Sequence, residues 1–422
     1  MQQCLRICGK QKTQGSIRIN GAKNSAVAVL PAALLTEKTV KVENLPSITD
    51  IYRLTDILSV LGAKVSILSE TSLGLDLSGV DSFCPPPGLV NQLRASYYLM
   101  GSLLGRFGRV DIPMPGGCDL GPRPIDQHIK GFSALGADVE LEHGVMKLQA
   151  RKLKGAHIYL DIVSVGATIN IMLAAVLAEG KTIIENVAKE PEIVDVANFL
   201  NAMGARVRGA GTDVIRIQGV KELGSAEHIV IPDRIEAGTF MIAAAATGGE
   251  VLVKDVIPKH LDAVIAKLKE VGVGLDIGLD WVLVKESGPG CLLSSDVKTF
   301  PYPGFPTDLQ PHMMVLLTRS QGTSLITENV FERRFRHIDE LKKMGARIKL
   351  EGRSAMIEGG HELTGANLQA MDLRGGASFV IAALISEGET LIQGVEHIDR
   401  GYEKIEDRFA SLGVRIERIG GI

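Results

Sequence analysis

The sequence predicts an α/β fold with two domains, each built from three copies of one repeated unit. Three observations lead to this expectation: a short glycine motif recurs six times, a helix of small and apolar residues recurs about once in each interval, and strand-like runs separate the helices. The 422 residues also fit two or three domains at about 150 residues per domain.

The recurring motif is an apolar residue, a glycine, a small residue and an extended run. Successive glycines are 74, 68, 68, 73 and 68 residues apart, at Gly62, Gly136, Gly204, Gly272, Gly345 and Gly413. Each follows an amphipathic helical pattern, as in Ile193–Met203, so the glycine is expected just past the helix end, where it tolerates positive φ. The residues after it alternate as a strand does.

The second recurring element is a helix that is apolar on nearly every face, which places it inside a bundle of helices. Its copies are Ser25–Leu35, Ser96–Leu104, Ala167–Ala178, Gly238–Ala246, Asp308–Leu317 and Ala377–Ser386. Each unit is therefore predicted as buried helix, strand, surface helix and strand, with a further short strand. Six units give two domains, each with three sheets around central helices. The alternative is a generic α/β protein in which the glycines recur by chance, but both helices repeat in phase.

The domain boundaries are expected near residues 20 and 230. The runs GSIRINGAK (15–23) and IVIPDRI (229–235) each place a strand-like segment before a break. One domain is predicted to span 21–230, and the other to combine 1–20 with 231–422. Two chain crossings would form a hinge, with a substrate cleft between the domains.

Composition narrows the function classes. Hydrophobic residues make up 45% and charged residues 23%, and the net charge of -3 lacks the basic excess of a nucleic-acid binder. The apolar stretches are too short to span a bilayer, and the first residues show no secretory signal. Five scattered cysteines predict reduced thiols and a cytoplasmic protein, and no residue spacing indicates a metal or another cofactor.

A loop around one of these cysteines is the most unusual stretch. Gly116–Pro124 and the preceding residue hold three glycines and three prolines, which exclude regular structure. The cation Arg123 lies five residues after Cys118 and would favour its thiolate. An incidental surface cysteine is an equal alternative at this point.

Charged residues also precede or open the buried helices. Lys23 and Asn24 lie before the first, Asp308 opens another, and arginines occupy comparable boundaries at Arg94, Arg123, Arg334, Arg374 and Arg400. A guanidinium suits carboxylate and phosphate, and helix N-termini attract anions. The alternatives are a solvated lysine, solvated arginines and, for Asp308, helix capping, which the residue pattern alone favours.

Nine segments in order resemble the enolpyruvyl transferase family, and in particular its UDP-N-acetylglucosamine 1-carboxyvinyltransferases. They are INGAKNSA, PMPGGCDLGPRPID, DxxSVGATINIMLA, EPEIVD, PDRIEAGTF, FPTDLQ, ENVFERRFRHIDEL, DLRGGAS and HIDRGYE. The resemblance covers essentially the whole chain. It implies a two-domain inside-out α/β barrel built from six repeated units, three per domain.

The resemblance implies transfer of the enolpyruvyl group of phosphoenolpyruvate to the 3′-hydroxyl of UDP-N-acetylglucosamine, with loss of phosphate and without a cofactor. The reaction is an addition followed by an elimination, through a tetrahedral intermediate, and is the first committed step of peptidoglycan synthesis. Cys118 would be the general acid toward the methylene carbon, Lys23 and Arg400 would hold the donor phosphate, and Asp308 would be the hydroxyl base or act in the elimination.

The remaining implied roles concern binding. Arg334 and Arg374 would complete the cationic site, and Arg123 would contact phosphate on loop closure. The amino-sugar nucleotide would contact Asn24, Arg94, Asp308 and Val330, and its uridine and diphosphate end would contact Pro124, Ile125, Asp126, His128, Ser164, Val165 and Gly166. Some members carry a lysine where this chain has Ile162. Only small-molecule partners are expected, for a monomer or weak homo-oligomer.

Two other functions compete with this interpretation. The sister enolpyruvyl transferase, which acts on shikimate 3-phosphate, shares the fold but lacks the cysteine loop and the ENVFERRF segment. A symmetric scaffold without catalysis would fit the repeats, but it would not need lysine, arginine, aspartate and cysteine at helix starts in different repeats.

Overall fold

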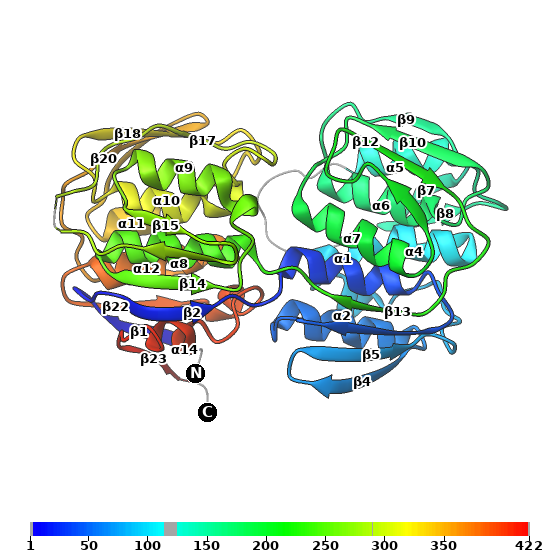
Figure 1. The fold of residues 1–422 in the computed structure, drawn as a ribbon, viewed down its shortest axis with the longest axis horizontal. Helices are drawn as coiled ribbons and strands as arrows, with labels where there is room; N and C mark the ends of the chain where they lie inside the picture. Colours follow the sequence, from blue (N-terminus) through cyan, green and yellow to red (C-terminus); the bar gives the residue numbers. More distant parts are fainter. Residues whose placement is uncertain (1–2, 114–124, 289, 421–422) are drawn as a thin grey trace. The chain divides into compact units, whose positions relative to one another are not determined.

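The computed structural model describes residues 3–113, 125–288 and 290–420. The described residues of Met1–Asn20 and Pro232–Ile422 form one compact unit, named here the outer unit, and those of Gly21–Gly117 and Arg123–Ile231 form the other, named the inserted unit. Both units mix helices with small sheets, so the expected α/β fold is confirmed (Figure 1).

The inserted unit contains helices and strands in a repeating order. They are α1 (Lys23–Ala33), β3 (Thr39–Glu43), α2 (Thr49–Val60), β4 (Lys64–Ser69), β5 (Ser72–Asp76), α3 (Pro87–Val90), η1 (Arg94–Tyr97), α4 (Tyr98–Phe107), β6 (Arg109–Pro113), α5 (Asp126–Ala134), β7 (Asp138–Glu142), β8 (Val145–Gln149), β9 (His157–Tyr159), α6 (Val165–Ala175), β10 (Lys181–Glu185), α7 (Pro191–Ala202), β11 (Arg206–Arg208), β12 (Val214–Gln218) and β13 (Ala226–Ile229).

The outer unit follows the same order, with its first two strands at the start of the chain. Its elements are β1 (Cys4–Cys8), β2 (Gln14–Arg18), α8 (Arg234–Thr247), β14 (Glu250–Lys254), η2 (Pro258–Leu261), α9 (Asp262–Glu270), β15 (Leu275–Ile277), β16 (Trp281–Val284), β17 (Val297–Lys298), η3 (Thr307–Leu309), α10 (Gln310–Leu317), β18 (Thr323–Thr327), α11 (Ile338–Lys343), β19 (Arg347–Glu351), β20 (Ser354–Glu358), β21 (Asn367–Gln369), α12 (Leu373–Ile385), β22 (Glu389–Gln393), α13 (Val395–Ile398), α14 (Ile405–Ala410) and β23 (Ile416–Ile419).

The described residues of each unit form three separate sheets, as the repeats predict. The sheets of the inserted unit run β13-β3-β5-β4, β11-β12-β10-β9 and β6-β8-β7, and those of the outer unit run β21-β22-β1-β23, β15-β16-β14-β2 and β17-β18-β20-β19. Every four-stranded sheet has one parallel edge pair and is otherwise antiparallel, as in β13 beside β3. In the part of the chain that the structure describes, the sheets are not joined into one hydrogen-bonded barrel, and they surround the helices as separate faces.

The first strands of the chain complete two sheets of the outer unit. Strand β1 lies between β22 and β23, and β2 pairs in parallel with β14. The two crossings between units run side by side: the amide of Ala22 donates to the carbonyl of Ile231 at 2.7 Å, and that of Asp233 to the carbonyl of Asn20 at 2.9 Å. The chain therefore leaves and re-enters the outer unit at one place.

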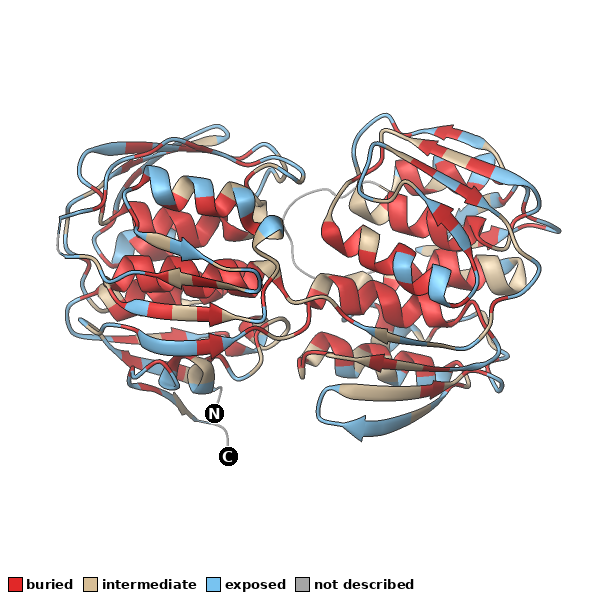
Figure 2. Cartoon of the chain, in the orientation of Figure 1, coloured by how far each residue is buried: buried red, intermediate tan, exposed pale blue. Residues whose placement is uncertain are grey.

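Helices that are buried on nearly all sides fill the centre of each unit (Figure 2). In the inserted unit α4 packs on both α1 and α6, and in the outer unit α8, α10 and α12 pack on one another. All eight residues of α10 are buried. The predicted small-rich helices are thus confirmed, although α1 begins at Lys23 rather than Ser25 and α10 is preceded by the 3₁₀ turn η3.

The glycine motif has the expected conformation in all six sequence repeats. Its glycines have φ between 83° and 107°, and each is followed by a strand: β4, β7, β11, β15, β19 or β23. The prediction of a surface helix before each glycine is wrong for α7, because α7 packs against α1, α6 and β13 and is largely buried. Over the described residues, no helix combines the length and the apolar character needed to cross a membrane.

Candidate active site

The N-terminal ends of three buried helices meet in the outer unit and carry charged side chains. Asp308 lies in η3, directly before α10, and Arg374 is the second residue of α12. Asp372 caps α12 by accepting hydrogen bonds at 3.0 Å from the amides of Arg374 and Gly375. Asp233, the N-cap of α8, lies close enough to raise the pKa of Arg374. The fold therefore gathers charge at one end of its helical core.

Asp308 pairs with two arginines there. Its Oδ1 accepts from Nη2 of Arg334 at 2.9 Å, and its Oδ2 accepts from Nε of Arg374 at 3.2 Å and lies 3.1 Å from Nη2. The two arginine side chains are 2% and 3% exposed, whereas Asp308 is 25% exposed. Asp308 is not the N-cap of η3 or α10, whose N-caps are Pro306 and Leu309, but it lies in the first turn of η3, where the helix dipole favours a carboxylate.

A buried aromatic residue lies against Arg374. The Cζ of Arg374 is 5.2 Å from the ring centre of Tyr402, whose hydroxyl lies 2.7 Å from Oγ1 of Thr239 and 3.3 Å from Nε2 of His312. Burial raises the pKa of Tyr402 and holds the pKa of His312 well below its usual value, so both are neutral at pH 7.

Arg374 keeps its charge in this setting. Burial alone would lower its pKa, but Tyr402 and Asp308 raise the pKa of Arg374 above its ordinary value. Its Nη1 is buried and has no hydrogen-bond partner in the part of the chain that the structure describes. A buried donor without an acceptor is costly, so this nitrogen is suited to bind an anionic ligand.

Two further predicted residues of the outer unit lie in segments held by carboxylates. Arg400 is half-buried between α13 and α14, directly after Asp399, which accepts from Nη2 and Nη1 of Arg418 at 2.7 and 2.8 Å. The amide of Val330 donates to Oε1 of Glu328 at 2.8 Å. Both segments are thus fixed by hydrogen bonds that the sequence pattern did not reveal.

In the inserted unit, Lys23 is the first residue of α1 and is buried. Its Nζ lies 2.9 Å from Oδ2 of Asp50, and the two side chains are 11% and 2% exposed. The solvated-lysine alternative is therefore wrong. Asn24 follows it and is half-buried.

A second group of predicted residues meets around His128 in α5. The imidazole is buried, and neither ring nitrogen has a hydrogen-bond partner within residues 3–113, 125–288 and 290–420. Burial lowers the pKa of His128 to about 4; nearby Arg94 acts in the same direction, while Asp126 opposes it. The ring contacts Tyr97 edge to face, with centroids 5.5 Å apart.

The start of α6 approaches this histidine closely. A Cβ added to Gly166 would lie 2.9 Å from Nε2 of His128 and 3.0 Å from the hydroxyl of Tyr97, so only glycine fits without movement. Ser164 caps α6 by accepting from the amide of Ala167 at 3.3 Å. The half-buried Val165 opens the same helix. The His128 group therefore combines unpartnered polar atoms with a helix N-terminus.

The other predicted residues are placed as follows. Ile125 is half-buried directly before α5, Asp126 opens that helix and is exposed, and Ile162 is exposed. Cys118, Arg123 and Pro124 lie outside the described residues.

Sequence reasoning missed several neighbours of these groups: Asp50, Tyr97, Glu328, Asp372 and Tyr402. Asp372 carried a usable signal, because an aspartate directly before a helical run is a common N-cap. No local pattern singles out the others, which reach the site through tertiary contacts.

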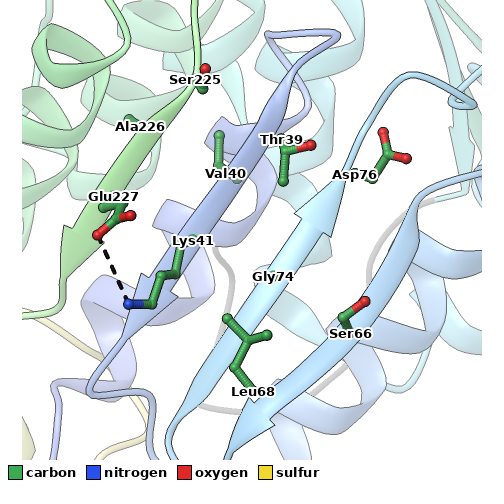
Figure 3. A pocket seen from close by; sticks show the side chains of 10 residues that line it. All are labelled: Thr39, Val40, Lys41, Ser66, Leu68, Gly74, Asp76, Ser225, Ala226 and Glu227. Carbon is green, nitrogen blue, oxygen red and sulfur yellow. Dashed lines mark ion pairs between the residues drawn. The ribbon is translucent and has the colours of Figure 1, made fainter.

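A hollow of about 620 Å³ lies elsewhere, on the outer face of the sheet β13-β3-β5-β4 (Figure 3). Its lining includes Lys41, which pairs with Glu227 at 3.9 Å, but none of the predicted site residues. The hollow is open and lined by side chains of the strands, so it lacks the groups that the predicted chemistry requires.

Comparisons with known proteins agree with the fold and identify the family. The family described as EPSP synthase (3-phosphoshikimate 1-carboxyvinyltransferase) matches residues 7–409. The chain is 57% identical over 413 residues to UDP-N-acetylglucosamine 1-carboxyvinyltransferase 3 of Caldanaerobacter subterraneus subsp. tengcongensis, with 98% of each chain covered. It is 56% identical over 414 residues to UDP-N-acetylglucosamine 1-carboxyvinyltransferase 2 of Bacillus subtilis, covering 98% of this chain and 96% of that protein.

Solved structures show the same architecture. The enolpyruvyl transferase NikO of Streptomyces tendae matches with a TM-score of 0.90 at 24% identity, covering 99% of both chains. EPSP synthase of Acinetobacter baumannii matches with a TM-score of 0.76 at 20% identity, over 100% of both chains. The fold is thus that of the enolpyruvyl transferases. Because the family match and these relatives cover nearly the whole chain, the chain belongs to the carboxyvinyltransferase family and is an enzyme that transfers a group between substrates.

Proposed function

We propose that this protein transfers the enolpyruvyl group of phosphoenolpyruvate to the 3′-hydroxyl of UDP-N-acetylglucosamine and releases phosphate. The observation that carries the proposal is the identity of 57% and 56%, over 98% of the chain, to two proteins named for this acceptor. The proposal includes a place at the first committed step of peptidoglycan synthesis, and so in cell shape and division, together with a cytoplasmic location and a monomeric or weakly associated state.

The cationic side chains are assigned to the donor. Phosphoenolpyruvate carries a phosphate and a carboxylate, and buried arginines with free donor atoms suit both. Arg374 offers its Nη1, which has no partner among the described residues, and Arg334 supplies a second buried guanidinium beside Asp308. Lys23 and Arg400 are assigned to the donor phosphate. Fixed cations of this kind stabilise charge that develops as phosphate leaves.

The His128 group is assigned to the nucleotide end of the acceptor. The start of α6, at Ser164–Gly166, presents backbone amides that suit a diphosphate. The ring nitrogens of His128, which lack partners in the described part of the chain, suit a polar base or a diphosphate oxygen. Pro124, Ile125 and Asp126 are assigned to the same end. Asn24, Arg94 and Val330 are assigned to the amino-sugar nucleotide, and Arg123 to substrate phosphate on loop closure.

The proposed chemistry has two steps. In the addition, Asp308 takes the proton of the 3′-hydroxyl, the hydroxyl oxygen bonds to carbon 2 of the donor, and Cys118 gives a proton to carbon 3. In the elimination, carbon 3 loses a proton, the double bond to carbon 2 re-forms and phosphate leaves. The partial exposure of Asp308 and the two arginines that bind its carboxylate oxygens support this assignment.

The test is release of phosphate from phosphoenolpyruvate by the full chain, with UDP-N-acetylglucosamine and shikimate 3-phosphate as parallel acceptors. The proposal expects release with the first acceptor and none with the second. Release only with shikimate 3-phosphate would replace the proposal by the sister activity, and release with neither would overturn it.

Variants and alkylation of Cys118 test its proposed role as the general acid. Cys118→Ala should abolish turnover, while Cys118→Asp should retain part of it, because aspartic acid also donates a proton. An epoxide phosphonate such as fosfomycin should add covalently to Cys118, seen as a mass increase of the intact protein that the alanine variant lacks. Normal turnover by Cys118→Ala would show that another group is the acid.

A further inference from the structure

Glu328 is a fully buried carboxylate that the reaction scheme above does not use. It follows strand β18 and has 0% of its surface exposed. Its Oε2 accepts from Oγ1 of Thr307 at 3.0 Å, and its Oε1 accepts from the amides of Val330 and Phe331 at 2.8 and 3.0 Å. Burying a carboxylate is costly unless hydrogen bonds compensate, and three donors from two segments do so here.

The first of these segments carries Asp308. Thr307 directly precedes it, and while the Thr307 hydroxyl binds Glu328, its carbonyl accepts from Nε of Arg334 at 3.1 Å. The same guanidinium donates from Nη2 to Asp308. Glu328 therefore fixes the side chain of Thr307, the residue directly before the proposed base Asp308.

The second segment carries Val330, assigned above to the acceptor sugar. Both amides on Oε1 belong to this turn, and the preceding amide of Asn329 donates to Oγ1 of Thr299 at 2.9 Å. The turn is thus held from two sides. The carboxylate of Glu328 links this turn to the Asp308 segment. Arg334 gives a second link, because its Cζ lies 6.0 Å from the ring centre of Phe331 and its guanidinium bonds Thr307 and Asp308.

We propose that Glu328 is a positioning residue that sets the proposed base relative to the acceptor sugar. It acts through Thr307 on Asp308 and through the turn amides on Val330. The inference rests on the proposed function, because it takes the roles of Asp308 and Val330 from it. Among the described residues, its partners are a hydroxyl and two amides rather than an arginine or lysine, so charge pairing within this part of the chain does not account for a carboxylate at this place.

Glu328 has two arms: its hydrogen bond to Thr307, which leads to Asp308, and its hydrogen bonds to the turn amides, which lead to Val330. Two pairs of variants test these arms separately. Thr307→Val removes only the arm to Asp308 at nearly constant volume, and Thr307→Ser keeps the hydroxyl. Glu328→Ala removes both arms, and Glu328→Gln keeps an acceptor for the turn amides. The matched control is Thr327→Val, since Thr327 ends the same strand and its hydroxyl hydrogen-bonds Ser354 at 3.1 Å, away from both arms.

Steady-state kinetics with both substrates give the readout. Thr307→Val should lower kcat about tenfold with KM for UDP-N-acetylglucosamine within about twofold, because misplacing a base slows chemistry without removing a binding contact. Glu328→Ala should also raise that KM about tenfold. Thr307→Ser, Glu328→Gln and Thr327→Val should stay within about threefold of the wild type in both constants.

Some outcomes would overturn the inference. If Thr307→Val lowers Tm but has the wild-type kcat at temperatures where the variant is folded, the hydrogen bond is only structural. If Thr307→Ser loses as much kcat as Thr307→Val, loss of the hydroxyl is not the cause. Should Glu328→Ala fail to fold, the Thr307 pair decides. A wild type without turnover counts against the proposed function, whereas an active wild type with unaffected variants counts against this inference alone.

Discussion

The Asp308 group of the outer unit, formed by Asp308, Arg334 and Arg374, and the His128 group of the inserted unit differ in how far their buried polar atoms are paired. Around Asp308, two buried arginines share one carboxylate, and of their donor atoms Nη1 of Arg374 is buried without a partner among the described residues. Around His128, both ring nitrogens are buried without a partner among the described residues, beside a helix start where only glycine fits without movement of the neighbouring rings.

The difference suggests different tasks. A group whose charges pair internally is held in place before any ligand arrives, which favours a catalytic role. An unsatisfied buried polar atom costs about 1–3 kcal/mol, which a ligand can return as binding energy. The comparison therefore assigns chemistry to the Asp308 group and recognition to the His128 group.

The largest expected effect comes from breaking the first group. Asp308→Asn keeps the side-chain shape but removes the base, so kcat should fall about a thousandfold. The measurement is phosphate release under saturation by both substrates. The control is Asp262→Asn, at an exposed carboxylate paired with Lys259. A loss below tenfold would remove Asp308 from the chemical step.

A smaller effect is expected from crowding the second group. In Gly166→Ala the added Cβ would lie 2.9 Å from Nε2 of His128, which forces the ring or α6 to shift. KM for UDP-N-acetylglucosamine should rise about 10- to 100-fold while kcat changes less, because the change acts on binding. Gly88→Ala, where an added Cβ meets nothing within 4 Å, is the matched control. Equal KM values in the two variants would contradict the assignment.

The smallest effect concerns stability and pH. The pKa of His128 is about 4 in the folded protein, below its usual 6.5, so the unfolded chain binds more protons between these values and stability falls as pH drops through that window. Between pH 7 and pH 5 the wild type should lose about 2 kcal/mol more than His128→Gln. Urea unfolding at both pH values measures this. The exposed His157→Gln should follow the wild type, and an unchanged pH dependence in His128→Gln would show that the ring is not buried as described.

Much of the fold was accessible from local patterns. The six glycines stand where a helix must end with positive φ, and the small-rich helices are buried because no face of them is polar. The boundaries were less accurate, since Lys23 lies inside α1 and α7 is covered by tertiary packing that its own residues do not indicate.

The site was accessible only in part. Helix-start positions led to Asp308, Arg334 and Arg374, but residue patterns favoured capping for Asp308, because its partners lie 26 and 66 residues away. The buried pair of Lys23 with Asp50 was missed for the same reason. His128 and Gly166 were named through family resemblance alone, since a close approach between α5 and α6 leaves no local signature.

The division of tasks is tested most directly by calorimetric binding of UDP, which cannot react, to the wild type, Gly166→Ala and Asp308→Asn. The account predicts that Gly166→Ala binds UDP at least about tenfold more weakly, while Asp308→Asn binds it within about twofold of the wild type. Weakened binding in Asp308→Asn with unchanged binding in Gly166→Ala would contradict it.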